Sequence, residues 1–317
     1  MEEKIRKRDI INIVKSMQDA CEILYKNSVS QADSMAILTE CQNAAIQIGE
    51  CIENQYDEQQ DIITLLENFC ESIYQSSLIY GEGESYKKQL KSIKKQLIEL
   101  HNRINHDLPE DKKEILFLPY KAAMWDSLES VWKAANEDEE CEVYVVPIPY
   151  YDKKNDGSFG EMHYEGDEYP EYVPITSWRE YNIAKRRPDV IYVHNPYDDN
   201  NYVTSVHPDF YSNKLRECTN MLVYIPYFVA VNDKVNPELC MTPAVLFAHK
   251  VIVQSEAVRK TYLEEFHKFE KENECKNVFG VPEEKIVALG SPKYDKVLNT
   301  KAEDFEIPKE WEKWLND

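Results

Sequence analysis

Four short apolar runs in this sequence each end at a Pro-Tyr dipeptide. Each run has the length and the apolar, often β-branched content of a buried strand. Proline has no backbone N–H and cannot continue a central hydrogen-bonded ladder, so each strand must end at the dipeptide. The tyrosines of the four dipeptides are Tyr120, Tyr150, Tyr197 and Tyr227.

The spacing of apolar residues changes close to residue 110. Residues 1–108 repeat at intervals of three and four, which predicts three or four antiparallel helices in a small accessory or oligomerisation bundle. Over 114–300 short β-rich runs alternate with helical stretches, which predicts a Rossmann-like, mainly parallel sheet with helices on both faces. The expected fold is therefore α/β with an N-terminal helical bundle, followed by a bridge or tail at 301–317. Strands are expected at 115–118, 142–147, 189–194, 221–225, 250–254 and 285–289.

One stretch departs from this alternation. Residues 150–176 contain three glycines, two prolines and several acidic residues. A loop of this length without regular structure is typical of a functional lid or a flexible segment. We expect such an excursion at the carboxyl end of a strand.

The composition excludes several classes of protein. The 58 acidic and 37 basic residues give a net charge of −21, which disfavours a nucleic-acid binder and general adhesion to anionic lipid. The eight cysteines form no CxxC pair, so neither a zinc site nor a redox motif is indicated, and no metal is expected. The sequence shows no signal-peptide core and no apolar run of membrane-spanning length, so we expect a cytoplasmic protein with reduced thiols.

The carboxyl ends of parallel strands form the ligand crevice of such folds, so the four Pro-Tyr tyrosines are predicted to bind substrate. His194 and Asn195 follow the strand expected at 189–194. His194 is the predicted general base, oriented by Asp198 or its neighbour Asp199, and Asn195 is a predicted substrate contact. The alternative is a capping and turn cluster, because Asn, Pro and Asp are the usual turn residues.

Two further segments favour contact with an anion. Lys121 lies just before a predicted helix start, and Ser291 and Lys293 follow a glycine at the last strand. A solvated lysine and a simple exit turn are the alternatives. The sequence contains no GxGxxG, P-loop or GxSxG motif, so no dinucleotide cofactor is expected.

Residues 286–295 read Ile-Val-Ala-Leu-Gly-Ser-Pro-Lys-Tyr-Asp, and 251–256 read Val-Ile-Val-Gln-Ser-Glu before a long helix. Both resemble segments of the CDP-glycerol glycerophosphotransferases, which are similar to the two-domain GT-B glycosyltransferases. The resemblance covers about residues 115–298. It implies an acceptor-binding first half, a nucleotide-binding second half, and a role in synthesis of a cell-surface polymer such as teichoic acid.

The sequence departs from the pattern of that family at two points. Where the family has a Trp-His-Gly-Thr motif, residues 224–229 contain no histidine, so His194 would have to replace the base. The second half is expected to be missing after Asp317, which would leave the chain inactive alone.

Three functions remain open at this point. The first is the acceptor-side half of a transferase, with a small-molecule or polymer acceptor and a nucleotide-activated donor bound only with a second domain. The second is a non-catalytic protein that binds a polyol or sugar, or that acts in assembly, and the third is an unrelated α/β enzyme. A homo-oligomer through residues 1–108 is a further hypothesis, and peripheral membrane contact is implied by the resemblance alone.

Overall fold

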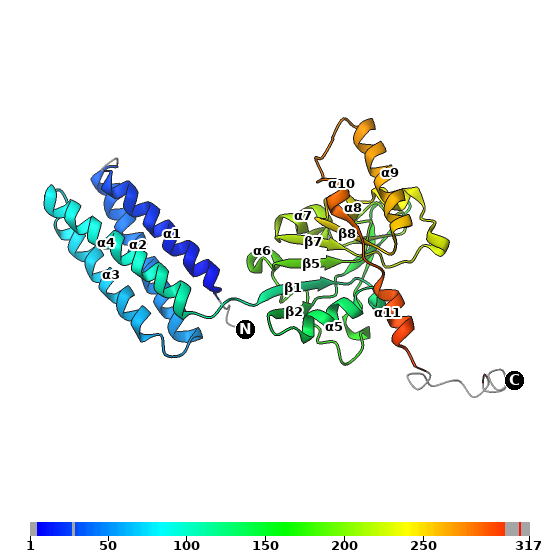
Figure 1. Cartoon of the computed structure of the whole chain (residues 1–317), viewed down its shortest axis with the longest axis horizontal. Coiled ribbons are helices and arrows are strands. Elements are labelled where there is room, and N and C mark those ends of the chain that lie inside the picture. Colours follow the sequence, from blue (N-terminus) through cyan, green and yellow to red (C-terminus); the bar gives the residue numbers. More distant parts are fainter. Residues whose placement is uncertain (1–4, 27–28, 302–310, 312–317) are drawn as a thin grey trace. The chain divides into compact units, whose positions relative to one another are not determined.

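The computed structural model describes residues 5–26, 29–301 and 311. The chain divides into two compact units, Met1–Asp111 and Lys112–Asp317 (Figure 1). The first is helical and the second carries a parallel six-stranded sheet, so the predicted α/β class with an N-terminal bundle is confirmed. Most of the expected tail at 301–317 lies outside the described residues.

The described residues of the first unit form four helices: α1 (Lys7–Tyr25), α2 (Gln31–Gln55), α3 (Gln60–Leu78) and α4 (Glu84–Asp107). Helix α4 packs against α1 and α3, and α2 packs against α3. Each helix turns one apolar stripe inward, at the spacing that the sequence predicts. The stripes include the fully buried residues Ile10, Val14, Ile52, Ile62, Ile93, Leu97 and Ile104.

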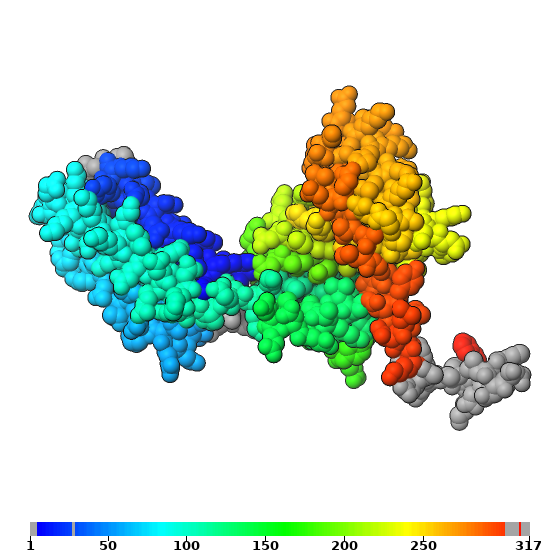
Figure 2. Space-filling model, in the orientation of Figure 1, coloured from blue at the N-terminus to red at the C-terminus, as the bar shows by residue number. Residues whose placement is uncertain are grey.

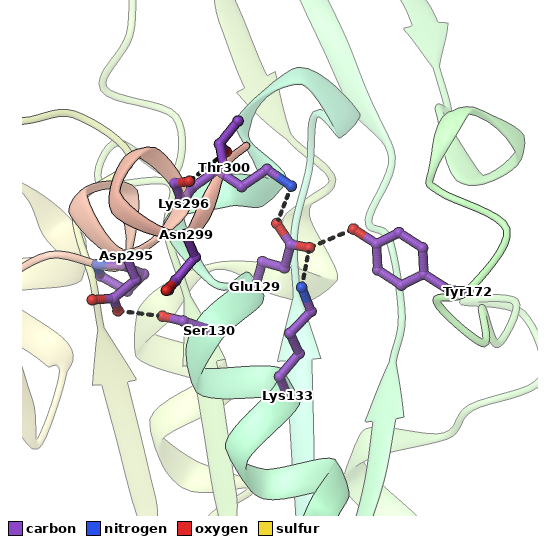
Figure 3. Close-up of a pocket in the computed structure, with 9 residues that line it drawn as sticks. Glu129, Ser130, Lys133, Tyr172, Asp295, Lys296, Asn299 and Thr300 are labelled. Atoms are coloured by element: carbon purple, nitrogen blue, oxygen red, sulfur yellow. Dashed lines mark hydrogen bonds and ion pairs between the residues drawn. The ribbon is translucent and has the colours of Figure 1, made fainter. Parts of the chain in front are cut away.

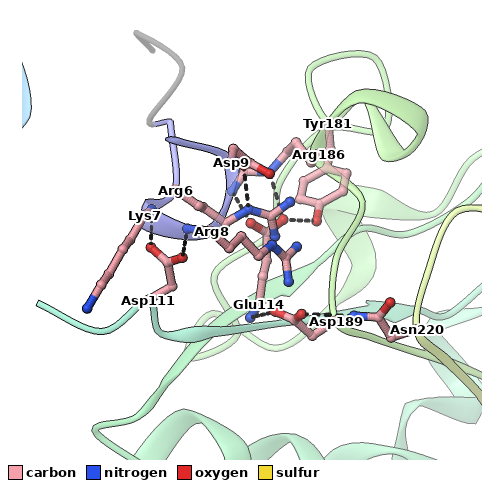
Figure 4. Close-up of polar contacts among 10 residues, drawn as sticks. All are labelled: Arg6, Lys7, Arg8, Asp9, Asp111, Glu114, Tyr181, Arg186, Asp189 and Asn220. Atoms are coloured by element: carbon pink, nitrogen blue, oxygen red, sulfur yellow. Dashed lines mark hydrogen bonds and ion pairs between the residues drawn. The ribbon is translucent and has the colours of Figure 1, made fainter. Parts of the chain in front are cut away.

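Polar contacts fasten the ends of these helices. The Ser30 hydroxyl oxygen accepts from the Asp33 N–H and caps α2. The buried Lys7 ammonium donates to two backbone carbonyls near the end of α4 and to Glu110 at 2.6 Å. The Asp111 carboxylate accepts the Lys7 and Arg8 N–H groups at the first turn of α1 (Figure 4). The start of α1 is thereby joined to the end of the bundle.

The second unit contains all six expected strands, and their order across the sheet is β2-β1-β5-β7-β8-β9. Every neighbouring pair runs parallel. The chain passes from β1 to β2 on one side and then returns to β5 on the other side of β1. The winding direction therefore reverses between β1 and β5, and the carboxyl edge beside these two strands is the switch point of the sheet. The strands are β1 (Lys113–Leu118), β2 (Cys141–Val145), β5 (Val190–Val193), β7 (Met221–Tyr224), β8 (Lys250–Val253) and β9 (Ile286–Ala288).

Both faces of this sheet are covered. Alternate residues of β1 enter two separate apolar clusters, with Leu116 in one and Phe117 in the other. The Leu116 cluster includes residues of α7, α8 and α9, whereas the Phe117 cluster includes Trp125 of the 3₁₀ helix η1 and Trp132 of α5. The α-helices of the second unit, together with the first 3₁₀ helix, are η1 (Ala122–Ser127), α5 (Glu129–Glu137), α6 (Ile183–Arg186), α7 (Ser212–Glu217), α8 (Pro243–Phe247), α9 (Glu256–Glu272), α10 (Pro282–Lys285) and α11 (Pro292–Asn299).

The amino end of β1 is fastened by a buried carboxylate. Glu114 accepts two hydrogen bonds from the Arg186 guanidinium, at 2.8 and 2.9 Å, and one from the Tyr181 hydroxyl (Figure 4). The Glu114 N–H donates to Asp189, which also accepts from Asn220. These contacts lie at the edge of the sheet opposite to the switch point.

Part of the 150–176 excursion is regular, which corrects the expectation of an irregular lid. Strand β3 (Tyr150–Lys153) pairs antiparallel with β4 (Phe159–His163) and with β6 (Thr204–Val206). Gly157 takes φ +81° in the tight connection between β3 and β4, a conformation that favours glycine. The sequence signal was weak because the hairpin is short and mostly polar.

Helix α11 lies on the outside of the second unit, in orange-red in Figure 2. It follows the edge strand β9 and contacts η1 and α5, which follow β1. It therefore connects the two sides of the sheet at the carboxyl edge. In the described part of the chain no helix is long and apolar enough to cross a membrane.

Leu97 tests the packing of the bundle. We expect Leu97→Ala to lower the free energy of unfolding by about 2–5 kcal/mol, because the side chain is fully buried and its removal leaves a cavity. Urea unfolding followed by circular dichroism measures this loss. Ile98→Ala is the matched control, since Ile98 is 45% exposed. Equal losses in both variants would contradict this packing of α4.

Candidate functional site

The four Pro-Tyr tyrosines gather at the carboxyl edge of the sheet. The ring centroids of Tyr120 and Tyr150 lie 5.5 Å apart and nearly perpendicular. Tyr120 is also 5.5 Å from the imidazole of His194, and His194 is 6.3 Å from Tyr227. Burial and a hydrogen bond with Tyr197 raise the pKa of Tyr227, which places the fourth tyrosine in the same group. We call these four residues the tyrosine group.

Lys121 supplies the positive charge of the tyrosine group. Its ammonium lies 4.9 Å from the centroid of Tyr150 and 5.6 Å from that of Tyr120, within cation–π range. Among the described residues no carboxylate lies within ion-pair distance of it. The sequence predicted a cation at this point, and the structure places it on two aromatic rings at the switch point.

The hydroxyls of the tyrosine group differ in their partners. Tyr150 donates to Glu165 at 2.7 Å, and Glu165 also accepts from the Ala122 N–H. Burial, followed by the hydrogen bond with Glu165, raises the pKa of Tyr150, and burial raises that of Tyr120 to about 12. The Tyr120 and Tyr150 hydroxyls are therefore protonated near neutral pH and can act as hydrogen-bond donors. Tyr197 and Tyr227 are the two partly exposed members.

His194 is fully buried and both of its ring nitrogens are engaged. Nε2 accepts from the Tyr120 N–H at 3.0 Å, so the proton of the neutral ring is assigned to Nδ1, which donates to the Ser127 hydroxyl at 2.8 Å. Burial lowers the pKa of His194 to about 3. A general base needs a free nitrogen and a pKa near the working pH. The geometry supports a structural link between the ends of β1 and β5 rather than the predicted base.

Asp198 does not orient His194. Its carboxylate accepts from the N–H and the hydroxyl of Ser212 at 2.8 and 2.9 Å and thereby caps α7. Burial raises the pKa of Asp198 to about 7. Asn195 accepts from the Tyr197 N–H in a local turn. The geometry of these residues favours the alternative of a capping and turn cluster.

Lys293 and Ser291 lie at the start of α11. Lys293 donates to both carboxylate oxygens of Asp126 at 2.6 Å, so the lysine predicted to meet a phosphate instead joins α11 to η1. Ser291 lines a small cavity of about 10 Å³ with Tyr262, and neither hydroxyl has a partner among the described residues. That space is at the lower limit for one water molecule.

The structure also brings two residues to the tyrosine group that the sequence analysis did not select. The His163 ring stacks on Tyr150 with centroids 5.1 Å apart, and its Nε2 lies 2.8 Å from Asp152. Glu165 contacts the Tyr150 hydroxyl. His163 pairs directly with Tyr150 across the β3–β4 hairpin. Recognition of this strand pairing in the sequence would have placed His163 beside the tyrosine group.

Comparison with models of protein families, with curated proteins and with solved structures found no match. In the described part of the chain no three His, Cys, Asp or Glu residues form a group that could hold a metal ion.

His194→Ala tests the structural link. We expect it to lower the free energy of unfolding by about 2–5 kcal/mol at neutral pH, because the Tyr120 N–H and the Ser127 hydroxyl lose their buried partner. The difference in free energy of unfolding between the wild type and His194→Ala is largest above pH 6.5 and decreases as the pH falls towards 3. Between these values the unfolded chain binds a proton that the folded imidazole does not. Denaturant unfolding at several pH values measures this, with the exposed His106→Ala as control.

A loss below about 0.5 kcal/mol at neutral pH, the range usual for a surface substitution, would return His194 to the candidate catalytic residues.

Proposed function

We propose that the α/β unit binds a hydroxyl-rich acceptor, a polyol or a sugar, at the tyrosine group, and that it is the acceptor-side half of a glycerophospho- or glycosyltransferase of GT-B type. The observation that supports this most directly is the gathering of Lys121 and four tyrosines at the switch point of a parallel sheet. The switch point is where open α/β sheets bind ligands.

The chemistry of the tyrosine group suits such an acceptor. Tyrosine rings offer apolar faces to the C–H surfaces of a polyol, and protonated hydroxyls offer donors to its oxygens. Tyr197 and Tyr227 are partly exposed, and because they share one hydrogen bond, the pair offers one hydroxyl proton and free oxygen lone pairs to a ligand. Lys121 adds a positive charge that stabilises a phosphate or the charge that develops on one.

Transfer also requires a base for the acceptor hydroxyl, and we propose His163 for this role. Its Nε2 is held by Asp152, and Nδ1 makes no hydrogen bond with a described residue. A carboxylate that orients one imidazole nitrogen leaves the other to take a proton. His163 is also partly exposed, in contrast to His194, so it can exchange its proton with solvent.

A second candidate function is non-catalytic binding of the same class of ligand. It is favoured by the burial of His194, because the histidine at the expected strand end is not available for chemistry. The two functions share the acceptor and differ in whether His163 takes part in transfer.

Binding tests the acceptor class. We expect saturation-transfer NMR with glycerol, ribitol and maltose to give contact signals for at least one probe. The double variant Tyr197→Phe, Tyr227→Phe should weaken that binding about tenfold, since two neutral hydrogen bonds are lost. Tyr74→Phe is the control, because Tyr74 is 51% exposed on α3. Signals that are absent, or that are unchanged in the double variant, would contradict an acceptor site at the tyrosine group.

Turnover tests the base. In a transfer assay in which a nucleotide-binding second domain is supplied, with CDP-glycerol as donor and the polyol identified by NMR as acceptor, we expect His163→Ala to reduce kcat about 10²–10⁴-fold with little change in acceptor KM. His106→Ala is the control in this assay also. Polyol binding without any transfer by the wild type, with the second domain present, would favour the non-catalytic function. Transfer that is unaffected in His163→Ala would exclude this residue as the base.

A further inference from the structure

A cavity of about 530 Å³, lined mostly by residues with polar side chains, lies between α5 and α11 in the second unit. It shares no residue with the tyrosine group. Figure 3 shows side chains of α5 and α11, together with Tyr172 and Thr300, around it. The cavity has the size of a small-ligand site. The residues that line it are Glu129, Ser130, Lys133, Tyr172, Pro292, Asp295, Lys296, Asn299 and Thr300.

A buried carboxylate forms the base of the cavity. The Glu129 side chain is 4% exposed and accepts from Lys133 at 2.8 Å, from Lys296 at 3.0 Å and from the Tyr172 hydroxyl. Burial alone would raise the pKa of Glu129, but these three donors outweigh it and lower the pKa to about 2. The Glu129 carboxylate is therefore ionised, and these three donors already satisfy it without a further cation.

The two lysines are not fully used by this contact. Each ammonium has three N–H donors and directs one to Glu129, and both side chains remain about half exposed at the cavity. Glu129 accepts from both lysines but carries only one negative charge. The Asn299 amide adds two more donors to the wall. Asp295 is the other anion of the lining, and it already accepts from Ser130 at 2.7 Å.

The cavity is concave, and its two lysines share one carboxylate. Several of its N–H groups are not directed at Glu129. Such a surface fits an anion with several acceptor oxygens. Charge-assisted hydrogen bonds from ammonium groups to such oxygens are among the stronger polar contacts in proteins. A monocarboxylate offers two oxygens, whereas a phosphate offers at least three to donors that belong to different helices. The arrangement therefore favours a phosphate group.

We propose that this cavity binds the phosphate group of a small soluble molecule, with Lys133 of α5 and Lys296 of α11 as its two cationic contacts. Because these lysines belong to different helices, the bound anion connects α11 to α5. Binding then stabilises the position of α11 at the carboxyl edge. The proposal does not rest on the function assigned to the tyrosine group.

Thermal unfolding and calorimetry of the full chain test the proposal, with inorganic phosphate and glycerol 3-phosphate as probes at constant ionic strength. A ligand that binds only the folded state raises Tm with its concentration. We expect this rise in the wild type, with an apparent Kd weakened about tenfold or more in Lys133→Gln and in Lys296→Gln, since each loses a charge-assisted contact. Lys133→Arg should retain most of the binding.

Lys260→Gln is the matched control, because Lys260 also pairs with a glutamate on a helix surface but lies on α9. It should bind phosphate as the wild type does. If a Gln variant unfolds at low temperature, its affinity is measured by calorimetry below its transition, and Lys133→Arg still reports on the charge. No rise of Tm with either probe, or the same rise in the wild type and both Gln variants, would overturn the proposal. Lys133→Gln and Lys296→Gln leave the tyrosine group unchanged, and inorganic phosphate carries no polyol, so a loss of phosphate binding confined to these variants is independent of the results for the tyrosine group.

Discussion

The two hydrogen bonds of the buried His194 imidazole hold together the part of the molecule on which the candidate site depends. One fixes the backbone of Tyr120 after β1, and the other fixes Ser127 in η1. Lys121 lies between these two points, so its position over the tyrosine rings follows from them. Because the ring is neutral, the link satisfies buried polar groups without placing a charge in the interior.

Helix α11 restrains the same segment from outside, by different forces. Only Pro292 of the helix is buried, so it has little apolar anchorage. Its contacts are the Lys293–Asp126 pair, the Lys296–Glu129 pair and the hydrogen bond of Asp295 with Ser130. Ion pairs at a partly exposed surface weaken with salt, whereas the apolar faces of the sheet do not. The carboxyl edge is therefore held by a firm inner link and a weaker outer one.

Much of the fold was predictable from the sequence, because two strong physical signals act there. Prolines end four of the expected strand regions, and the three-four spacing of apolar residues marks the bundle helices. All six parallel strands were expected, with bounds that differ by one or two residues. The β3–β4 hairpin was missed, since it is short, largely polar and ended by a turn rather than by a proline. The hairpin is stabilised by hydrogen bonds between its strands and with β6, and no residue pattern in the sequence marks these pairings.

The sequence predicted where the candidate site lies, but not the roles of the individual residues in it. The four tyrosines and Lys121 come together because strand ends share one edge, and that follows from strand order alone. Whether a histidine at that edge faces solvent or the interior depends on the path of the next loop. The η1 helix covers His194 and occupies its Nδ1 through Ser127, whereas the hairpin leaves His163 partly exposed beside Asp152. Residue type and strand-end position therefore select the edge of the sheet, and only tertiary contacts decide which histidine there can exchange a proton.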